Sequence, residues 1–330
     1  MERAILRMVY KRVEPAGTAR YSVSPLAAGE EYTVEEYTVA VDSLIVQPPG
    51  STDAYRHAGP IAVAPVPWRR YCRWHSGPLD SRDEPWTRIY CNVPLPGGRW
   101  EYCRQHRRSE RFLYDVCVGL HGEQALEACR LLDSRVKAEY AVYLLAQQGG
   151  HVKVGVTRRF RVLERIAEQP HAAATVLAVY TSALQARRAE IAVSRAGIAS
   201  EHRPRSKSKL PPPGPAAAAI HRAAERAASL LGVSWDGRVL RVRPPAGEPP
   251  PAGRAADPSR LQGETLEVAG YWGGLILASL PSHRVWVDER RLLHMDSLLL
   301  PTPPWDGGLT LNRPEHPRPR GAHPGPRGFT

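Results

Sequence analysis

The sequence lacks any long uncharged apolar segment. No such run approaches the roughly 20 residues that a membrane-spanning helix needs. The segment from Met1 to Met8 also lacks the apolar core, followed by small residues, that marks a secretory signal. We therefore predict a cytoplasmic protein without a membrane partner.

Cysteine is also scarce, with five residues in a chain of 330. In a reducing compartment, an odd number of cysteines favours metal ligation or free thiols over a framework of disulfides. The intracellular proteins of thermophiles do contain disulfides, and this exception stays open.

Lysine is uncommon, because only five of the 45 Lys and Arg residues are lysines. The formal net charge of +12 is unevenly spread, since residues 151–210 contain twelve Lys or Arg against four Asp or Glu. A local positive field attracts phosphate backbones, so we expect DNA or RNA as a partner. A solubilising surface in an arginine-biased chain is the alternative explanation of the same composition.

The pattern of strands, helices and breakers predicts an α+β fold built from several segments. The 32 prolines gather at the edges and in the C-terminal third, so the packed part is expected to be shorter than the chain. The predicted segments are an N-terminal β unit at 1–66, a cysteine-containing module at 67–135, a β-β-α-β-α domain at 138–200, a basic and proline-rich linker at 201–258 with a helix at 216–231, a β meander at 259–300 and a disordered tail at 301–330.

The domain at 138–200 is predicted from alternating apolar runs and glycine-containing turns. A hairpin joins strands at 141–145 and 152–157, because the turn between them contains Gly149 and Gly150, and glycine accepts positive φ. An arginine-rich helix at about 158–168 follows, and then a strand and a second helix. This order of elements is β-β-α-β-α.

Three cysteines and a histidine form the clearest candidate metal site. Cys72, Cys91, Cys103 and His106 have the spacing Cys-x18-Cys-x11-Cys-x2-His, and zinc binds such thiolate and imidazole sets in closed tetrahedral sites. We therefore predict a structural Zn²⁺ and a zinc-binding module at 67–135. His75 follows Cys72 at the same two-residue interval as His106 follows Cys103, so His75 is an alternative fourth ligand.

The other two cysteines, Cys117 and Cys129, do not make a second complete zinc site, because two thiols leave the coordination unfilled. The alternative to zinc is a set of buried, reduced thiols beside an unrelated histidine. We prefer zinc because few long periodic segments precede Glu123, and a weakly patterned segment needs a metal to fold.

Seven short motifs together resemble the uncharacterised family that carries domain of unknown function 2797, with archaeal members most similar. They span about a third of the chain. In order, the motifs are Arg70-Tyr-Cys72, Cys91, Tyr102-Cys-Arg-Gln-His106, Ala141-Val-Tyr143-Leu-Leu, Lys153-Val-Gly-Val-Thr157, Arg165-Ile-Ala-Glu-Gln169 and Ala186-Arg-Arg-Ala-Glu190. That family is in turn similar to the GIY-YIG nucleases, which act on phosphodiesters with two tyrosines, an arginine and a metal-binding glutamate.

The resemblance implies four candidate catalytic residues. Tyr143 stands at the first tyrosine, Lys153 replaces the second, and Arg165 and Glu190 occupy the arginine and glutamate positions, while Gln169 replaces the usual histidine. In an active site of this kind, Tyr143 positions or deprotonates water, Arg165 stabilises charge on the phosphate, and Glu190 holds Mg²⁺. Lys153 binds a phosphate, or acts as a base if burial lowers its pKa.

Helical spacing independently places Glu190 on a small apolar face with Ala183, Ala186 and Val193. A carboxylate on such a face needs a partner, because an unpaired buried charge is costly. The sequence leaves two partners open, a divalent cation or an arginine, for instance Arg165, in a structural ion pair. For Tyr143 the structural alternative is a core aromatic residue, and for Arg165 it is a solvated helix face.

These observations support three functions. The first is a metal-dependent phosphodiester hydrolase, and the second is a non-catalytic DNA- or RNA-binding protein that keeps a GIY-YIG-like domain. The third is a protein-interaction scaffold with a purely structural zinc. The sequence does not identify protein partners.

Overall fold

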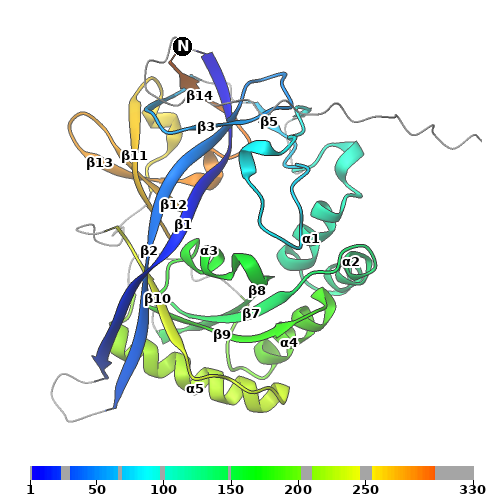
Figure 1. Ribbon diagram of the computed structural model, residues 1–330, viewed down its shortest axis with the longest axis vertical. Helices are drawn as coiled ribbons and strands as arrows, with labels where there is room; N and C mark the ends of the chain where they lie inside the picture. The colour runs from blue at the N-terminus through cyan, green and yellow to red at the C-terminus, as the bar shows by residue number, and fades with distance from the viewer. Residues whose placement is uncertain are drawn as a thin grey trace, which may run out of the picture.

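The fold is built around one large, mostly antiparallel sheet (Figure 1). The computed structural model describes residues 2–23, 30–65, 69–96, 101–147, 150–201, 210–245 and 255–301. Within these ranges, twelve strands form this sheet in the order β13-β12-β11-β4-β14-β1-β2-β10-β9-β7-β8, with β3 beside β2. The strands are β1 Glu2–Ser22, β2 Glu31–Gln47, β3 Tyr55–His57, β4 Ile61–Val63, β7 Tyr140–Ala146, β8 Val152–Arg158, β9 Ala173–Tyr180, β10 Val239–Arg243, β11 Thr265–Trp272, β12 Leu275–Ser279, β13 Arg284–Asp288 and β14 Asp296–Leu300.

Five α-helices surround this sheet, and a small second sheet pairs β5 with β6, all within the described ranges. One apolar core joins β7 to α4 and α5, and a second joins the opposite face of β7 to α3 and to β11–β13. Strand β7 is therefore buried on both faces. The elements are α1 Glu110–Gly119, α2 Glu123–Asp133, α3 Val162–Ala167, α4 Ala183–Arg195, α5 Pro213–Leu231, β5 Arg70–Tyr71 and β6 Pro94–Leu95.

A long hairpin of β1 and β2 runs through the molecule and joins its two ends (Figure 1). The beginning of β1 pairs with β14, while β2 pairs in parallel with β10, which lies next to β9. The segments predicted as separate β units therefore share one sheet with the predicted β-β-α-β-α domain. The domain boundaries stay predictions.

Most predicted elements are present. The mixed α+β class is confirmed, and residues 138–200 form β7, β8, α3, β9 and α4 in the predicted order. The helix predicted at 216–231 is α5, and β11, β12 and β13 pair consecutively as a meander. The predicted tail from 302 onwards, the basic segment 202–209 and the proline-rich segment 246–254 lie outside the described residues.

Several elements were not predicted from the sequence, and two of them contradict what we expected of their segments. Strand β10 lies in the predicted linker, and helix α1 precedes Glu123 in a segment that we expected to have little regular structure. Strand β10 has only five residues, and its main partner β2 precedes it by about 200 positions, so its local pattern carries little signal. Helix α1 begins at an N-cap, Ser109, whose side chain accepts from the Phe112 amide.

The cysteines outside the metal cluster form a disulfide, which corrects the expectation of metal-bound or free thiols. Cys117 on α1 and Cys129 on α2 are both buried and bonded to each other. The two helices pack as a hairpin and bring the Cα atoms to 5.0 Å, within the range that a disulfide spans. A disulfide is the exception that the sequence left open.

His171 connects the β-β-α-β-α segment to β10. Its ring is 1% exposed, its Nδ1 donates to the Gln169 carbonyl at 2.8 Å, and its Nε2 accepts from the Val242 amide at 3.0 Å. These partners require the neutral ring with a proton on Nδ1. Burial lowers the pKa of His171 to about 4, the Gln169 carbonyl opposes this shift, and Arg241 adds to it.

We predict that the free energy of unfolding falls as the pH drops from about 6.5 to about 4. In this pH range the unfolded chain binds a proton at His171 that the folded chain excludes. The difference lowers the free energy of unfolding by on the order of 3 kcal/mol. Urea denaturation at several pH values measures the loss. His171→Gln keeps an acceptor for Val242 and should show a smaller pH dependence, whereas equal pH dependence in both proteins would contradict the assignment.

Candidate metal centre and adjoining cavity

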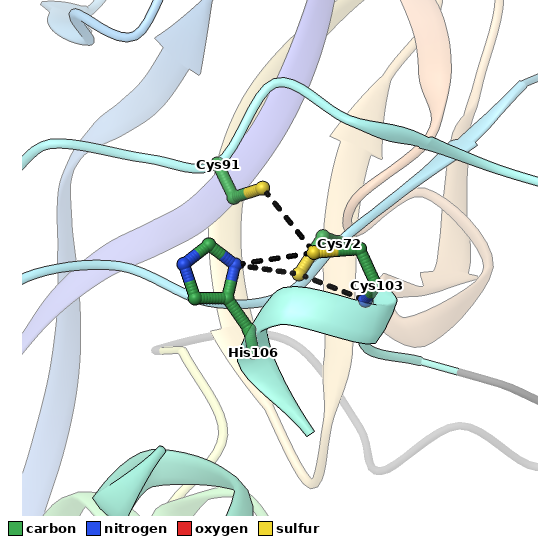
Figure 2. Close-up of side chains that lie close together, drawn as sticks. All are labelled: Cys72, Cys91, Cys103 and His106. Carbon is green, nitrogen blue, oxygen red and sulfur yellow. Dashed lines mark hydrogen bonds between the residues drawn. The ribbon is translucent and has the colours of Figure 1, made fainter. Parts of the chain in front are cut away.

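Three short loops bring the four predicted metal ligands together (Figure 2). Cys72 directly follows β5, Cys91 precedes β6, and Cys103 and His106 lie at a single 3-10 turn, Arg104–His106. Backbone hydrogen bonds fix these loops, since the Cys72 amide donates to the Val93 carbonyl at 3.1 Å. The ligands therefore approach from three separate parts of the chain.

The geometry of the cluster fits a tetrahedral metal ion. All four ligand atoms lie within 4.8 Å of one another. His106 Nδ1 is 3.3 Å from Cys103 Sγ and 3.6 Å from Cys72 Sγ, and the sulfurs of Cys91 and Cys103 are 3.9 Å apart. Zn–S bonds of about 2.3 Å place two sulfurs roughly 3.8 Å apart in a tetrahedron. The cluster can therefore hold a metal such as zinc, as predicted.

Burial also controls the protonation of these ligands. It raises the pKa of Cys72 to about 12 and raises the pKa of Cys91, so both thiols keep their protons at neutral pH without a cation. Burial lowers the pKa of His106, which leaves the ring neutral with an available lone pair. The indole of Trp74 stacks on the His106 ring with centroids 4.2 Å apart and orients it.

Arg7 of β1 connects the cluster to the large sheet. Its guanidinium is 2% exposed and donates to the carbonyls of Cys72 at 3.0 Å and Cys91 at 2.6 Å, and to Gln47 Oε1 at 2.6 Å. Burial lowers the pKa of Arg7 to about 10, and the neighbouring tyrosine and cysteines oppose this shift. Three thiolates around a divalent cation have a net charge of −1, which complements the buried guanidinium.

His75, the alternative ligand, is not part of the cluster. Its Nδ1 accepts from the Gly77 amide at 3.1 Å, and its Nε2 lies 3.5 Å from the guanidinium of Arg88. Both ring nitrogens therefore face other groups. The structure selects His106 as the fourth ligand.

The four predicted catalytic residues all line one cavity of about 1260 Å³ beside the cysteine-containing module. Tyr143 and Lys153 lie on the sheet, Arg165 lies on α3, and Glu190 lies on α4. Helix α4 covers the opposite face of the sheet from α3, so Glu190 lines the cavity beside the edge strand β8. Twelve Lys or Arg side chains line this cavity against eight Asp or Glu.

Gln169 links two of these residues. Its Nε2 donates to the Tyr143 hydroxyl at 2.7 Å, and its Oε1 accepts from Lys153 Nζ at 2.6 Å. Gly155 pairs with Tyr143 across the hairpin, and a Cβ there would lie 2.6 Å from the Tyr143 hydroxyl. Burial raises the pKa of Tyr143, so its hydroxyl keeps its proton and can donate to an oxygen in the cavity.

Glu190 forms an ion pair with an arginine, one of the two alternatives left open by the sequence, but the partner is Arg187 and not the suggested Arg165. Arg165 donates to Glu168 Oε2 at 2.8 Å, and Glu190 pairs with Arg187 one helical turn away. Sequence reasoning missed Arg187, although its i, i+3 spacing to Glu190 was a usable signal. Burial raises the pKa of Glu190 to about 7, and Arg187 opposes this shift.

The surroundings of Glu190 do not fit a magnesium site in this arrangement. Its carboxylate already bonds Arg187, whose other terminal nitrogen donates to Glu201 at 3.1 Å and to the Leu120 carbonyl at 2.7 Å. Lys153 adds another positive charge nearby. A divalent cation needs uncommitted oxygen ligands, and these carboxylates are engaged by arginine.

Comparison of the chain with protein-family models, curated proteins and solved structures finds no match. The resemblance to the GIY-YIG nucleases therefore stays a prediction. Within the described residues, no helix combines the length and apolar character needed to cross a membrane.

We predict that the purified protein contains zinc and that His106→Gln loses most of it, because a closed site needs all four ligands. Elemental analysis by mass spectrometry measures the metal. His75→Gln is the matched control, since it changes the same residue type nearby but outside the cluster. Equal zinc content in the two variants would remove His106 from the site.

Proposed function

We propose that this chain binds DNA or RNA in the cavity beside the metal cluster. The proposal rests on one observation, an excess of Lys and Arg along one cavity. The cysteine-containing module and the β-β-α-β-α segment both contribute residues to the lining of this cavity. A concave surface with an excess of positive charge attracts phosphate backbones. The resemblance to GIY-YIG proteins points to the same ligand.

In this proposal, the metal cluster has a structural role. The loops that hold the cluster continue into residues that line the cavity, including Arg73 and Tyr102. Tyr102 donates to Asp115 on α1 at 2.6 Å, and this contact connects the cluster to the helix beside the cavity. A bound zinc would keep this wall of the cavity ordered.

The geometry favours binding without hydrolysis. Glu190, the residue expected to hold a catalytic metal, is neutralised by Arg187, and Lys153 stands where the related enzymes have a tyrosine. The Tyr143 hydroxyl and the Lys153 ammonium group both line the cavity, and Gln169 forms a hydrogen bond with each of them. These groups suit the recognition of phosphate oxygens.

Phosphodiester hydrolysis is the second candidate function. It is favoured by one observation, that Tyr143, Lys153, Arg165 and Glu190 line the same cavity. Hydrolysis would require Glu190 to leave Arg187 before it could bind a divalent cation. A metal at that position would supply electrostatic stabilisation of the phosphate.

Binding can be measured by fluorescence anisotropy with labelled single- and double-stranded DNA and RNA. We expect affinity to fall steeply with salt, because phosphate contacts release counterions. Lys153→Gln should weaken binding about tenfold, roughly the effect of one charge-assisted contact. Lys137→Gln is the control, since Lys137 is exposed and does not line the cavity. The absence of binding at low salt would contradict the proposal.

The same nucleic acids, incubated with and without Mg²⁺, separate the two functions. We expect binding without cleavage, because the carboxylate of Glu190 is committed to Arg187. Cleavage that requires Mg²⁺ and disappears in Glu190→Gln would instead establish the hydrolase. Gel electrophoresis of end-labelled substrates measures the products.

A further inference from the structure

Two arginines of the cavity are held side by side by backbone carbonyls. Arg111 lies in the first turn of α1, and its terminal nitrogen donates to the Gly77 carbonyl at 2.6 Å while its Nε donates to the His75 carbonyl at 3.3 Å. Arg158, at the end of β8, donates to the Pro78 carbonyl at 3.2 Å. One short loop therefore orients both guanidinium groups.

Their charges are not balanced by carboxylates. In the described part of the chain, neither Arg111 nor Arg158 has a carboxylate oxygen within 4.0 Å, although Arg158 is only 3% exposed. The Nε of Arg158 is buried and has no hydrogen-bond partner there. Three other arginines of the cavity do have glutamate partners. These are Arg161 and Arg165 with Glu168, and Arg187 with Glu190.

The neighbouring groups respond to this unbalanced charge. Burial alone raises the pKa of Tyr114, yet Arg158, Arg161 and Arg165 lower it below its ordinary value. Burial, together with Arg158 and Arg88, lowers the pKa of Arg111 to about 10, and Tyr102 and Asp115 oppose this shift. Both shifts are those expected near a cationic pocket that lacks its anion.

The Tyr114 side chain completes the wall of the pocket. Its ring centroid is 4.7 Å from the guanidinium carbon of Arg158, and its hydroxyl lies 3.3 Å from Thr157 Oγ1. Tyr114 and Thr157 both line the same cavity as the two arginines. Two hydroxyls are therefore available beside two guanidinium groups.

We infer that Arg111 and Arg158 form a binding site for a phosphate group. Guanidinium groups match the tetrahedral oxygens of phosphate with paired N–H donors, and the hydroxyls of Tyr114 and Thr157 supply further contacts. A bound phosphate offsets the cost of one buried and one half-buried positive charge. The contacts described above support the phosphate site by themselves. That the bound phosphate belongs to a nucleic acid rests on the proposed function.

The test is thermal unfolding of the full chain with increasing inorganic phosphate, at ionic strength held constant with chloride. We expect phosphate to raise the melting temperature by about 4 °C at saturation, because it binds only the folded state. Arg158→Gln and Arg111→Gln should lose this rise. Arg130→Gln removes the same charge from an exposed ion pair with Glu127 and should keep it.

If Arg158→Gln does not fold, Arg158→Lys tests the same site, since lysine keeps the positive charge but lacks the paired N–H donors of arginine. We expect its phosphate affinity, measured by calorimetry, to fall at least fivefold. No stabilisation beyond that of chloride, or an equal response in Arg130→Gln and the two pocket variants, would overturn the site.

Competition identifies the source of the phosphate. A short oligonucleotide with a 5′-phosphate that displaces inorganic phosphate, when the same oligonucleotide with a 5′-hydroxyl does not, would assign the site to nucleic-acid ends. Displacement by both would assign it to the backbone, and displacement by neither would assign it to a small phosphate compound. Glu190→Gln should keep the phosphate response, so failure of the hydrolase hypothesis leaves this inference intact.

Discussion

The buried guanidinium of Arg7 is the contact on which the arrangement of this protein depends. It extends from the central hairpin and donates to the carbonyls of Cys72 and Cys91, two of the four metal ligands. A negative partner stabilises a buried charge of this kind, and a divalent ion held by the three cysteines as thiolates would provide one. Arg7 therefore couples the charge of the metal cluster to the position of β1. Because residues of the cluster loops and of β1 line the cavity, the same contact also determines the shape of its wall.

The parts of the site that could be read from the sequence are those set by short spacing. Cys103 and His106 are separated by two residues, so one tight turn is enough to direct both at one ion, and this pair was predicted. The hairpin of β7 and β8 was predicted for the same reason, since its strands and turn are contiguous. Strand β10 was missed because its burial depends on β2, far away in the chain.

Errors occurred where a side chain had several partners within reach. Glu190 was expected to bind a cation or an arginine such as Arg165, and the partner is a different arginine, Arg187, on the same helix. Cys117 and Cys129 were expected to stay out of disulfides, but the hairpin of α1 and α2 places them in contact. Composition and spacing identify which residues are reactive, whereas packing decides which partner each of them meets.

The pairing of β1 with β14 has a consequence for biosynthesis. Glu2 lies opposite Leu300, so β1 leaves the ribosome long before β14 is made, and the backbone groups of β1 that face β14 are not bonded until then. During that interval, the free edge of β1 is open to strands of other nascent chains. A pause in synthesis between the two strands would lengthen this exposure and increase the risk that the chain aggregates.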